Sequence, residues 1–168
     1  MQRRSLLKLG LVSGLVLAVA GGAAVLLQPG LEQGRLTAPA RALFASLGRA
    51  ILQGTLPAAP QAAALAVQGM VERIDTLAQN LPPHVQAELS QLVGLLCTAP
   101  GRLGLAGLTP AWQDATEAQV QAALDGMRYS SLAVRQQAYL ALHEIVGGAY
   151  FSDESTWTVV GYPGPMAI

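Results

Sequence analysis

The chain has 168 residues, of which 52% are hydrophobic and 12% charged, and its ten basic and ten acidic side chains cancel to a formal net charge of zero. This composition excludes an intrinsically disordered chain, which needs low hydrophobicity and high net charge. It also excludes a nucleic-acid binder, which needs an excess of basic residues. The single cysteine excludes a disulfide framework and a metal site built from several cysteines. The length predicts one domain with a modest hydrophobic core.

The chain begins with a basic segment followed by an uncharged apolar stretch. Residues 9–27 contain no charged side chain, and a basic head before such a stretch is typical of an export signal. The pattern Arg-Arg-x-Leu-Leu-Lys resembles the twin-arginine signal, and its residues here are Arg3, Arg4, Leu6, Leu7 and Lys8. This resemblance implies export of an already folded protein by the twin-arginine translocase. The alternative is an ordinary secretory signal in which two arginines occur together by chance.

The apolar stretch can be removed or retained, and the residues leave both outcomes open. Ala18-Val19-Ala20 fits a small-x-small cleavage site. A retained stretch would nearly span a hydrocarbon core of ~30 Å at ~1.5 Å per residue. We therefore divide the chain into residues 1–28, a twin-arginine signal or retained membrane anchor, and residues 29–168, a helical domain. Both outcomes predict a periplasmic domain, either released or anchored through residues 9–27.

Without the signal, the charge balance of the chain changes. The remainder has seven arginines against ten acidic residues, a formal charge of −3, and it contains no lysine. The missing lysine excludes Schiff-base chemistry and Ser/Lys catalytic pairs. The missing basic excess also argues against binding to anionic lipid.

Hydrophobic residues spaced about 3.6 positions apart predict an all-α fold, a small irregular bundle of about five helices with an extended C-terminal tail. This periodicity places Leu77 and Leu132 among the buried positions and Asp75 on a polar face. Residues 101–110 are expected to form a loop, and no segment alternates well enough to predict a strand. The expected helices cover residues 39–53, 63–79, 85–96, 116–127 and 131–147, and Thr116 and Gln119 form a capping box at the start of the fourth.

Side chains that could carry catalysis are few and poorly placed. His84 and His143 both lack the i, i+4 partner that a metal pair on one helix needs. Cys97 is expected to be a buried, inert thiol, and Gly101–Gly107 has the wrong spacing for a dinucleotide-binding loop. Tyr129 lacks the lysine of a tyrosine-based reductase site. We therefore expect no catalytic, cofactor-binding or metal-ligating residue in this chain, and no enzyme activity of its own.

The last nineteen residues hold four of the eight aromatic side chains, together with prolines and glycines. Asp153 is expected to cap one short helical turn that contains Trp157, and Gly161 is expected to end it. A rigid amphipathic segment of this kind suits a binding surface, whereas a tail that folds back over its own bundle is the alternative. The candidate partner contacts are Tyr150, Phe151, Trp157, Gly161, Tyr162, Pro163, Gly164 and Pro165.

The pattern Tyr-Phe-x-Asp-(x3)-Trp-(x3)-Gly-Tyr-Pro-Gly-Pro, from Tyr150 to Pro165, resembles the C-terminal signature of the gluconate 2-dehydrogenase subunit 3 family. Members are small helical proteins with twin-arginine signals that accompany FAD-dependent dehydrogenases of the glucose–methanol–choline oxidoreductase class. The resemblance implies that a large partner subunit binds FAD and that this chain escorts it, folded, across the membrane. It also implies that a cytochrome c or the respiratory chain receives the electrons. Cys97 is alone, so the internal disulfide that some members could form does not carry over.

Two functional hypotheses follow. The first is a non-catalytic small subunit of a periplasmic FAD-dependent dehydrogenase complex, which exports and stabilises the flavoprotein subunit. The second is a stand-alone periplasmic or membrane-anchored helical protein that binds an apolar small molecule. The surplus of alanine and leucine predicts more apolar surface than the bundle can hide, and an exposed patch of that kind usually marks an interface.

Overall fold

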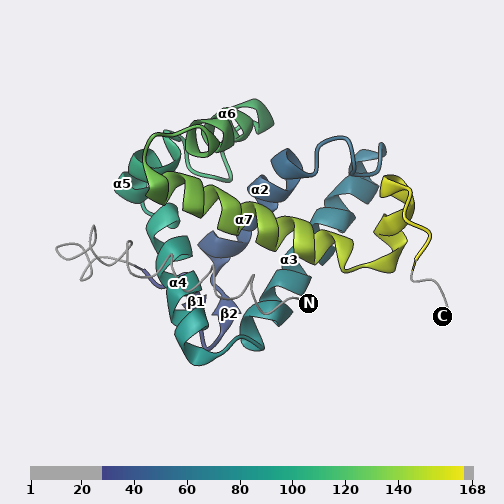
Figure 1. The fold of residues 1–168 in the computed structure, drawn as a ribbon, viewed down its shortest axis with the longest axis horizontal. Helices are drawn as coiled ribbons and strands as arrows, with labels where there is room; N and C mark the ends of the chain where they lie inside the picture. The colour runs from purple at the N-terminus through teal and green to yellow at the C-terminus, as the bar shows by residue number, and fades with distance from the viewer. Residues whose placement is uncertain (1–27, 165–168) are drawn as a thin grey trace.

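The computed structural model describes residues 28–164, so the twin-arginine motif, the cleavage site and Pro165 lie outside the described residues. The predicted all-α fold is confirmed: the structure is a helical bundle with one very small hairpin (Figure 1). Its elements, in chain order, are β1 (Leu31–Glu32), β2 (Arg35–Leu36), α2 (Ala38–Ile51), α3 (Pro60–Gln79), α4 (Pro83–Cys97), α5 (Ala99–Gly101), the π-helical turn η1 (Arg102–Ala106), α6 (Glu117–Arg128), α7 (Ala133–Phe151) and the 3-10 helix η2 (Glu154–Val160).

Helix α2 is the centre of the bundle, because it packs against α3, α4, α6 and α7. Leu43, Phe44 and Leu47 on this helix are fully buried. Gly48 faces α3, and a Cβ there would lie 2.7 Å from the Cε atom of Met70, so that this flexible side chain would have to move. Figure 1 shows α7 crossing the middle of the molecule, with α6 near its first half and η2 beyond its end.

The hairpin is held to α3 by a buried carboxylate. Its two strands pair Leu31 with Leu36 through a turn in which Gln33 and Gly34 both have positive φ, as a type I′ hairpin turn requires. The amide of Leu36 donates to Asp75 at 2.6 Å, and the other carboxylate oxygen lies 3.4 Å from Arg41. The prediction that Asp75 lies on a polar, exposed face was therefore wrong, because a partner from outside the helix buries it.

The predicted absence of strands was also wrong, and the predicted loop over residues 101–110 was wrong for residues 101–106, whereas residues 107–110 lie outside any helix or strand. The strands are two residues long, too short for alternation to reveal them. Residues 99–106 form helical turns, because the Thr98 hydroxyl accepts from the amide of Gly101 and so caps them. Arg102 then bonds the carbonyls of Leu108 and Thr109, at 3.3 and 3.1 Å, and closes the segment.

The observed helix ends and buried positions agree with the prediction in α6 and differ from it in α3 and α7. The capping box of Thr116 and Gln119 is present, and the apolar residues Val120, Ala123, Leu124 and Met127 of α6 are buried. Leu77 is 45% exposed because it falls at the edge of the buried face of α3, and Leu132 is 57% exposed because it precedes α7 as its N-cap. Helix α7 continues to Phe151, four residues beyond its predicted end.

The first described residues pack tightly on α4. Gly30 is buried, and its amide donates to the carbonyl of Ser90 at 3.1 Å. A Cβ on Gly30 would lie 2.7 Å from the Cβ of Val93 and 2.8 Å from the Ser90 carbonyl oxygen. These atoms belong to the helix backbone or lie next to it, so no side-chain rotation can make room.

We predict that Gly30→Ala lowers the free energy of unfolding by about 1–3 kcal/mol, because the added methyl group pushes the segment off α4. Gly126→Ala is the matched control. Gly126 lies inside α6 with open space around it, so its replacement should stabilise the helix by up to about 1 kcal/mol. Urea denaturation of both variants measures the difference, and equal effects of the two substitutions would contradict the packing described here.

Candidate functional site

The C-terminal segment forms a capped 3-10 helix. One carboxylate oxygen of Asp153 accepts the amide of Ser155 at 3.0 Å and its hydroxyl at 2.7 Å, so Asp153 is the N-cap of η2. Gly161 ends the helix with a φ of +68°, a conformation that glycine adopts without strain. Both features confirm the predicted helical turn, and Trp157 lies inside it.

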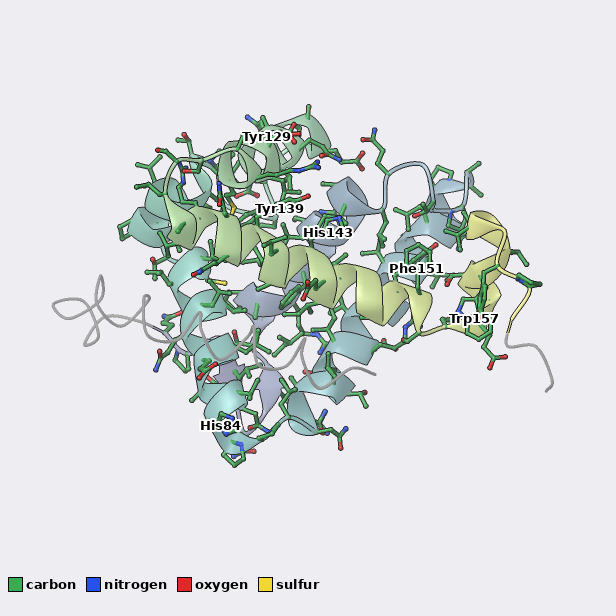
Figure 2. All side chains as sticks on the ribbon, in the orientation of Figure 1. His84, Tyr129, Tyr139, His143, Phe151 and Trp157 are labelled. Carbon is green, nitrogen blue, oxygen red and sulfur yellow. The ribbon has the colours of Figure 1, made fainter. Side chains whose placement is uncertain are left out.

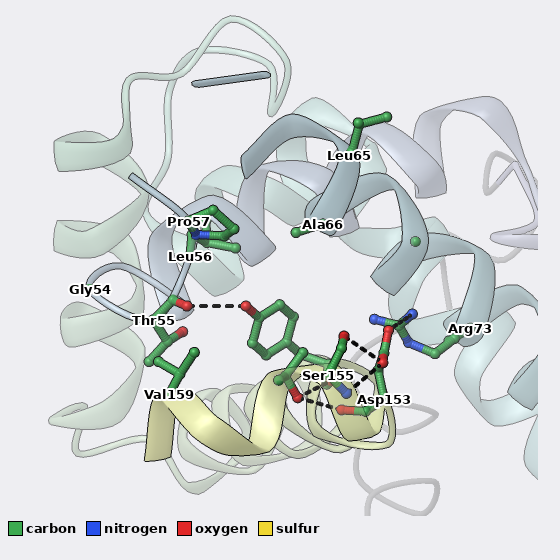
Figure 3. A pocket seen from close by; sticks show the side chains of 13 residues that line it. Gly54, Thr55, Leu56, Pro57, Leu65, Ala66, Arg73, Asp153, Ser155 and Val159 are labelled. Carbon is green, nitrogen blue, oxygen red and sulfur yellow. Dashed lines mark hydrogen bonds and ion pairs between the residues drawn. The ribbon is translucent and has the colours of Figure 1, made fainter. Parts of the chain in front are cut away.

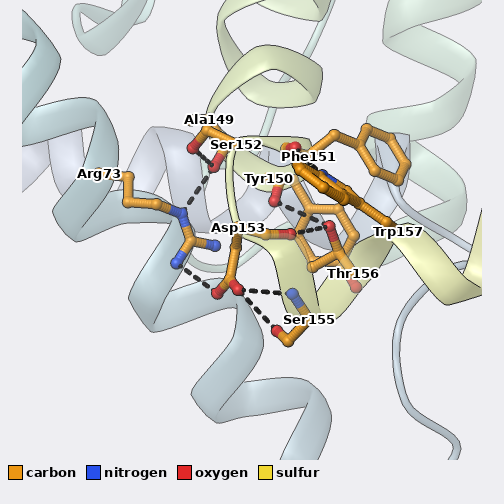
Figure 4. A network of polar contacts seen from close by, with 9 residues as sticks. All are labelled: Arg73, Ala149, Tyr150, Phe151, Ser152, Asp153, Ser155, Thr156 and Trp157. Atoms are coloured by element: carbon orange, nitrogen blue, oxygen red, sulfur yellow. Dashed lines mark hydrogen bonds and ion pairs between the residues drawn. The ribbon is translucent and has the colours of Figure 1, made fainter. Parts of the chain in front are cut away.

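One arginine of α3 helps to fasten this helix to the bundle, together with hydrogen bonds from Thr156 and Trp157 to the last turn of α7 (Figure 4). Arg73, from α3, donates through Nε to the carbonyl of Ala149 at 2.7 Å and through Nη1 to the second oxygen of Asp153 at 3.1 Å. The guanidinium thereby joins the last turn of α7 to the first residue of η2, across 80 positions of sequence. The hydrogen bonds from Ser155, followed by the charge of Arg73, lower the pKa of the Asp153 carboxyl, so it stays ionised and holds both contacts.

The aromatic side chains of the segment take different places. Tyr150 is 2% exposed, and its hydroxyl donates to the carbonyl of Thr55 at 3.1 Å. Trp157 is half-buried and donates through Nε1 to the carbonyl of Phe151 at 2.8 Å. Its ring lies 5.2 Å from that of Tyr162, in an edge-on arrangement. Figure 2 shows Phe151 and Trp157 at the C-terminal end of the bundle, well away from Tyr129 and Tyr139.

These positions correct one of the candidate contacts. Tyr150 was predicted to contact a partner, but its ring packs into the chain's own core, and burial raises the pKa of its hydroxyl. The tail thus folds back over the bundle in its first part. Its later part faces outward, with Val159, Val160 and Tyr162 exposed by 52%, 54% and 47%.

A pocket of about 340 Å³ lies between this segment and the neighbouring elements (Figure 3). Arg73, Asp153 and the hydroxyls of Ser155 and Thr156 line one part, and apolar groups line the rest. Among the described residues that line it, Asp153 is the one carboxylate, and it is already engaged by Arg73 and Ser155. The apolar part of the arrangement can hold an inserted apolar group. The apolar lining comes from Leu56, Pro57, Leu65, Ala66 and Val159.

The other candidate residues lie apart from this pocket. His84 is exposed at the start of α4, and His143 is exposed on α7 with its ring 5.6 Å from that of Tyr139. Burial raises the pKa of the Cys97 thiol to about 11, against a smaller opposing effect of Arg102. Cys97 is therefore protonated at neutral pH and is a poor nucleophile, as expected. Within residues 28–164, no group of three or more His, Cys, Asp or Glu side chains is placed to hold a metal ion.

Sequence reasoning missed Arg73, Leu65 and Thr55. No local pattern marks them, because each matters through a contact with a residue far along the chain, such as Tyr150 for Thr55. Of the helices that the structure describes, none is long and apolar enough to cross a membrane. The chain matches no protein-family model, and no curated protein or solved structure is detectably similar to it.

We predict that Arg73→Lys loosens η2 without unfolding the bundle. An ammonium group cannot bond the Ala149 carbonyl and Asp153 in the fork geometry that guanidinium allows. Amide hydrogen exchange of residues 154–161 should become about tenfold faster, equivalent to about 1.4 kcal/mol of local opening free energy. Arg35→Lys, on the exposed hairpin, is the control. Unchanged exchange in the Arg73 variant would show that the fork does not hold the segment.

The lowered pKa of Asp153 predicts the pH below which acid releases η2 from the bundle. A carboxyl group whose pKa is lower in the folded than in the unfolded state stabilises the fold fully at pH values above its unfolded pKa, which is about 3.9 for aspartate. This stabilisation is lost as the pH falls through the folded pKa. The amide NMR shift of Ser155 should therefore stay constant from pH 7 to 5 and change only below about pH 4. Asp153→Asn should remove this transition, and a transition between pH 5 and 7 in the unaltered chain would contradict the assignment.

Proposed function

We propose that this chain is the small, non-catalytic subunit of a periplasmic FAD-dependent dehydrogenase complex. It binds the folded flavoprotein subunit, directs it through the twin-arginine translocase by means of Arg3 and Arg4, and remains bound to stabilise it. FAD belongs to the partner, and a cytochrome c subunit is a further partner that would accept the electrons. The resemblance of the C-terminal segment to the gluconate 2-dehydrogenase subunit 3 family motivates this proposal.

The observation that carries the proposal is an ordered C-terminal segment that displays apolar side chains to solvent. Val159, Val160 and Tyr162 are about half exposed, and Leu65, which lines the same pocket as Val159, is 62% exposed. Exposed apolar groups that lie close together usually mark an interface. The Asp153 cap and the Arg73 fork fix these groups before any partner arrives, which reduces the entropy cost of binding.

The charged and aromatic side chains around the pocket are also consistent with a binding role. In the part of the chain that the structure describes, the pocket's Arg73–Asp153 pair is committed to holding the segment. Trp157 matches the tryptophan of the family's C-terminal signature. It is half-buried, and its ring packs edge-on against the ring of Tyr162. Trp157 therefore supports the surface from below, and the direct contacts come from Tyr162 and the two valines.

We predict that the double substitution Val160→Asp and Tyr162→Asp weakens binding to the flavoprotein at least tenfold, or about 1.4 kcal/mol, because two charges would be buried without partners. The two chains are co-expressed, the complex is purified through a tag on this chain, and affinity is measured with the separated subunits. Leu103→Asp is the matched control, since Leu103 is 57% exposed in η1, next to α5 and far from η2 (Figure 1).

The same purification tests the proposal itself. Recovery of this chain alone, monomeric and soluble, in the presence of the flavoprotein would contradict it. Native mass spectrometry that finds a bound apolar small molecule and no protein partner would favour a stand-alone binding protein instead.

A further inference from the structure

A second depression lies between α2 and α3, on a different face of α3 from the C-terminal pocket. It has a volume of about 640 Å³. Its α2 side has small residues, Ala42 and Ala45, between two arginines, Arg41 and Arg49. Its α3 side is lined mainly by Ala63, Ala64, Val67 and Val71, and Glu117, the first residue of α6, also lines it. We call this depression the α2–α3 groove.

Arg49 is held in a fixed position at the groove. Its Nη2 donates to the hydroxyl of Ser46 at 3.1 Å, and that hydroxyl donates to the carbonyl of Trp112 at 2.6 Å. Ser46 is only 2% exposed, so the guanidinium is oriented from beneath by a buried group. The ion pairs among the described residues join Arg41 to Asp75 and Arg73 to Asp153. Arg49 has no carboxylate within ion-pair distance there, although Glu117 lines the same groove.

The groove is continuous with the surface proposed above. Leu56 lines both the groove and the C-terminal pocket. The intervening stretch from Ala50 to Val71 contains no charged side chain, and its ridge exposes Ala64 and Leu65. The apolar linings of the pocket and of the groove therefore meet at Leu56, and the charged residues that line the groove are Arg41, Arg49 and Glu117.

We propose that the α2–α3 groove binds an amphipathic helix of the flavoprotein subunit, with a carboxylate of that helix paired to Arg49; this rests on the proposed function. Small residues on both sides let a helix approach closely, as in other helix-in-groove interfaces. An oriented guanidinium is well suited to bidentate binding of a carboxylate. The chain's own residues 1–27 do not fit this requirement, because they carry three basic side chains and no acidic one.

The test uses the full-length chain co-expressed with the flavoprotein subunit that the proposed function requires. Arg49→Glu should weaken the complex at least tenfold, and Arg49→Gln, which keeps an amide donor for Ser46, should weaken it less. Arg35→Glu makes the same charge change on the exposed hairpin and should have no effect. A photo-crosslinking benzoylphenylalanine at Ala45 should attach to one flavoprotein peptide, a helical one that contains an aspartate or glutamate.

The outcomes separate this inference from the proposed function. If the flavoprotein binds normally to Arg49→Glu and no crosslink forms from Ala45, the groove proposal fails while the subunit role stands. If the unaltered chain does not bind the flavoprotein, both fail. A crosslink to a second copy of this chain, or a fatty acid bound to the unaltered chain and lost from Arg49→Glu, would also overturn the assigned occupant.

Discussion

The two hydrogen bonds of Arg73 hold the C-terminal surface in place. One guanidinium bonds the carbonyl of Ala149 and the carboxylate of Asp153, and the same carboxylate caps η2 through Ser155. The position of η2 relative to α3 depends on this fork, and so does the pocket between them. Asp153 caps η2 through one carboxylate oxygen and pairs with Arg73 through the other, so one side chain serves both the start of the helix and its attachment. The exposed apolar groups of the segment are thereby presented on a rigid support.

Other arginines of the domain also donate hydrogen bonds to backbone carbonyls of its irregular segments. Arg102 bonds the carbonyls that follow η1, and Arg135 on α7 donates to the carbonyl of Leu105 at 2.6 Å. A planar guanidinium presents several donors at once, which suits it to the unpaired carbonyls at the ends of short helical turns. This use of charge explains how a domain with few ionic residues and no lysine fixes its irregular segments. Arg49 differs from these arginines, because it lines the α2–α3 groove and forms no ion pair among the described residues.

Features encoded by neighbouring residues could be predicted from the sequence. The helices follow from apolar periodicity, the start of α6 from the capping box of Thr116 and Gln119, and η2 from Asp153 and Gly161. Features that depend on contacts between distant residues could not be predicted. Asp75 is buried because the hairpin donates to it, and Tyr150 joins the core because Thr55 offers a carbonyl. At the candidate site, the aromatic segment was therefore predictable, whereas Arg73, Leu65 and the groove were not.

The apolar composition of the chain has two distinct sources besides the core. One is the uncharged stretch of residues 9–27, and the other is the surface from η2 across α3, which we propose as the site of the flavoprotein. The most direct test replaces Arg3 and Arg4 with lysines and compares flavin dehydrogenase activity in the periplasm and the cytoplasm. We predict that the activity disappears from the periplasm and accumulates in the cytoplasm with the complex intact. Undiminished periplasmic activity would contradict the role of this chain as the escort.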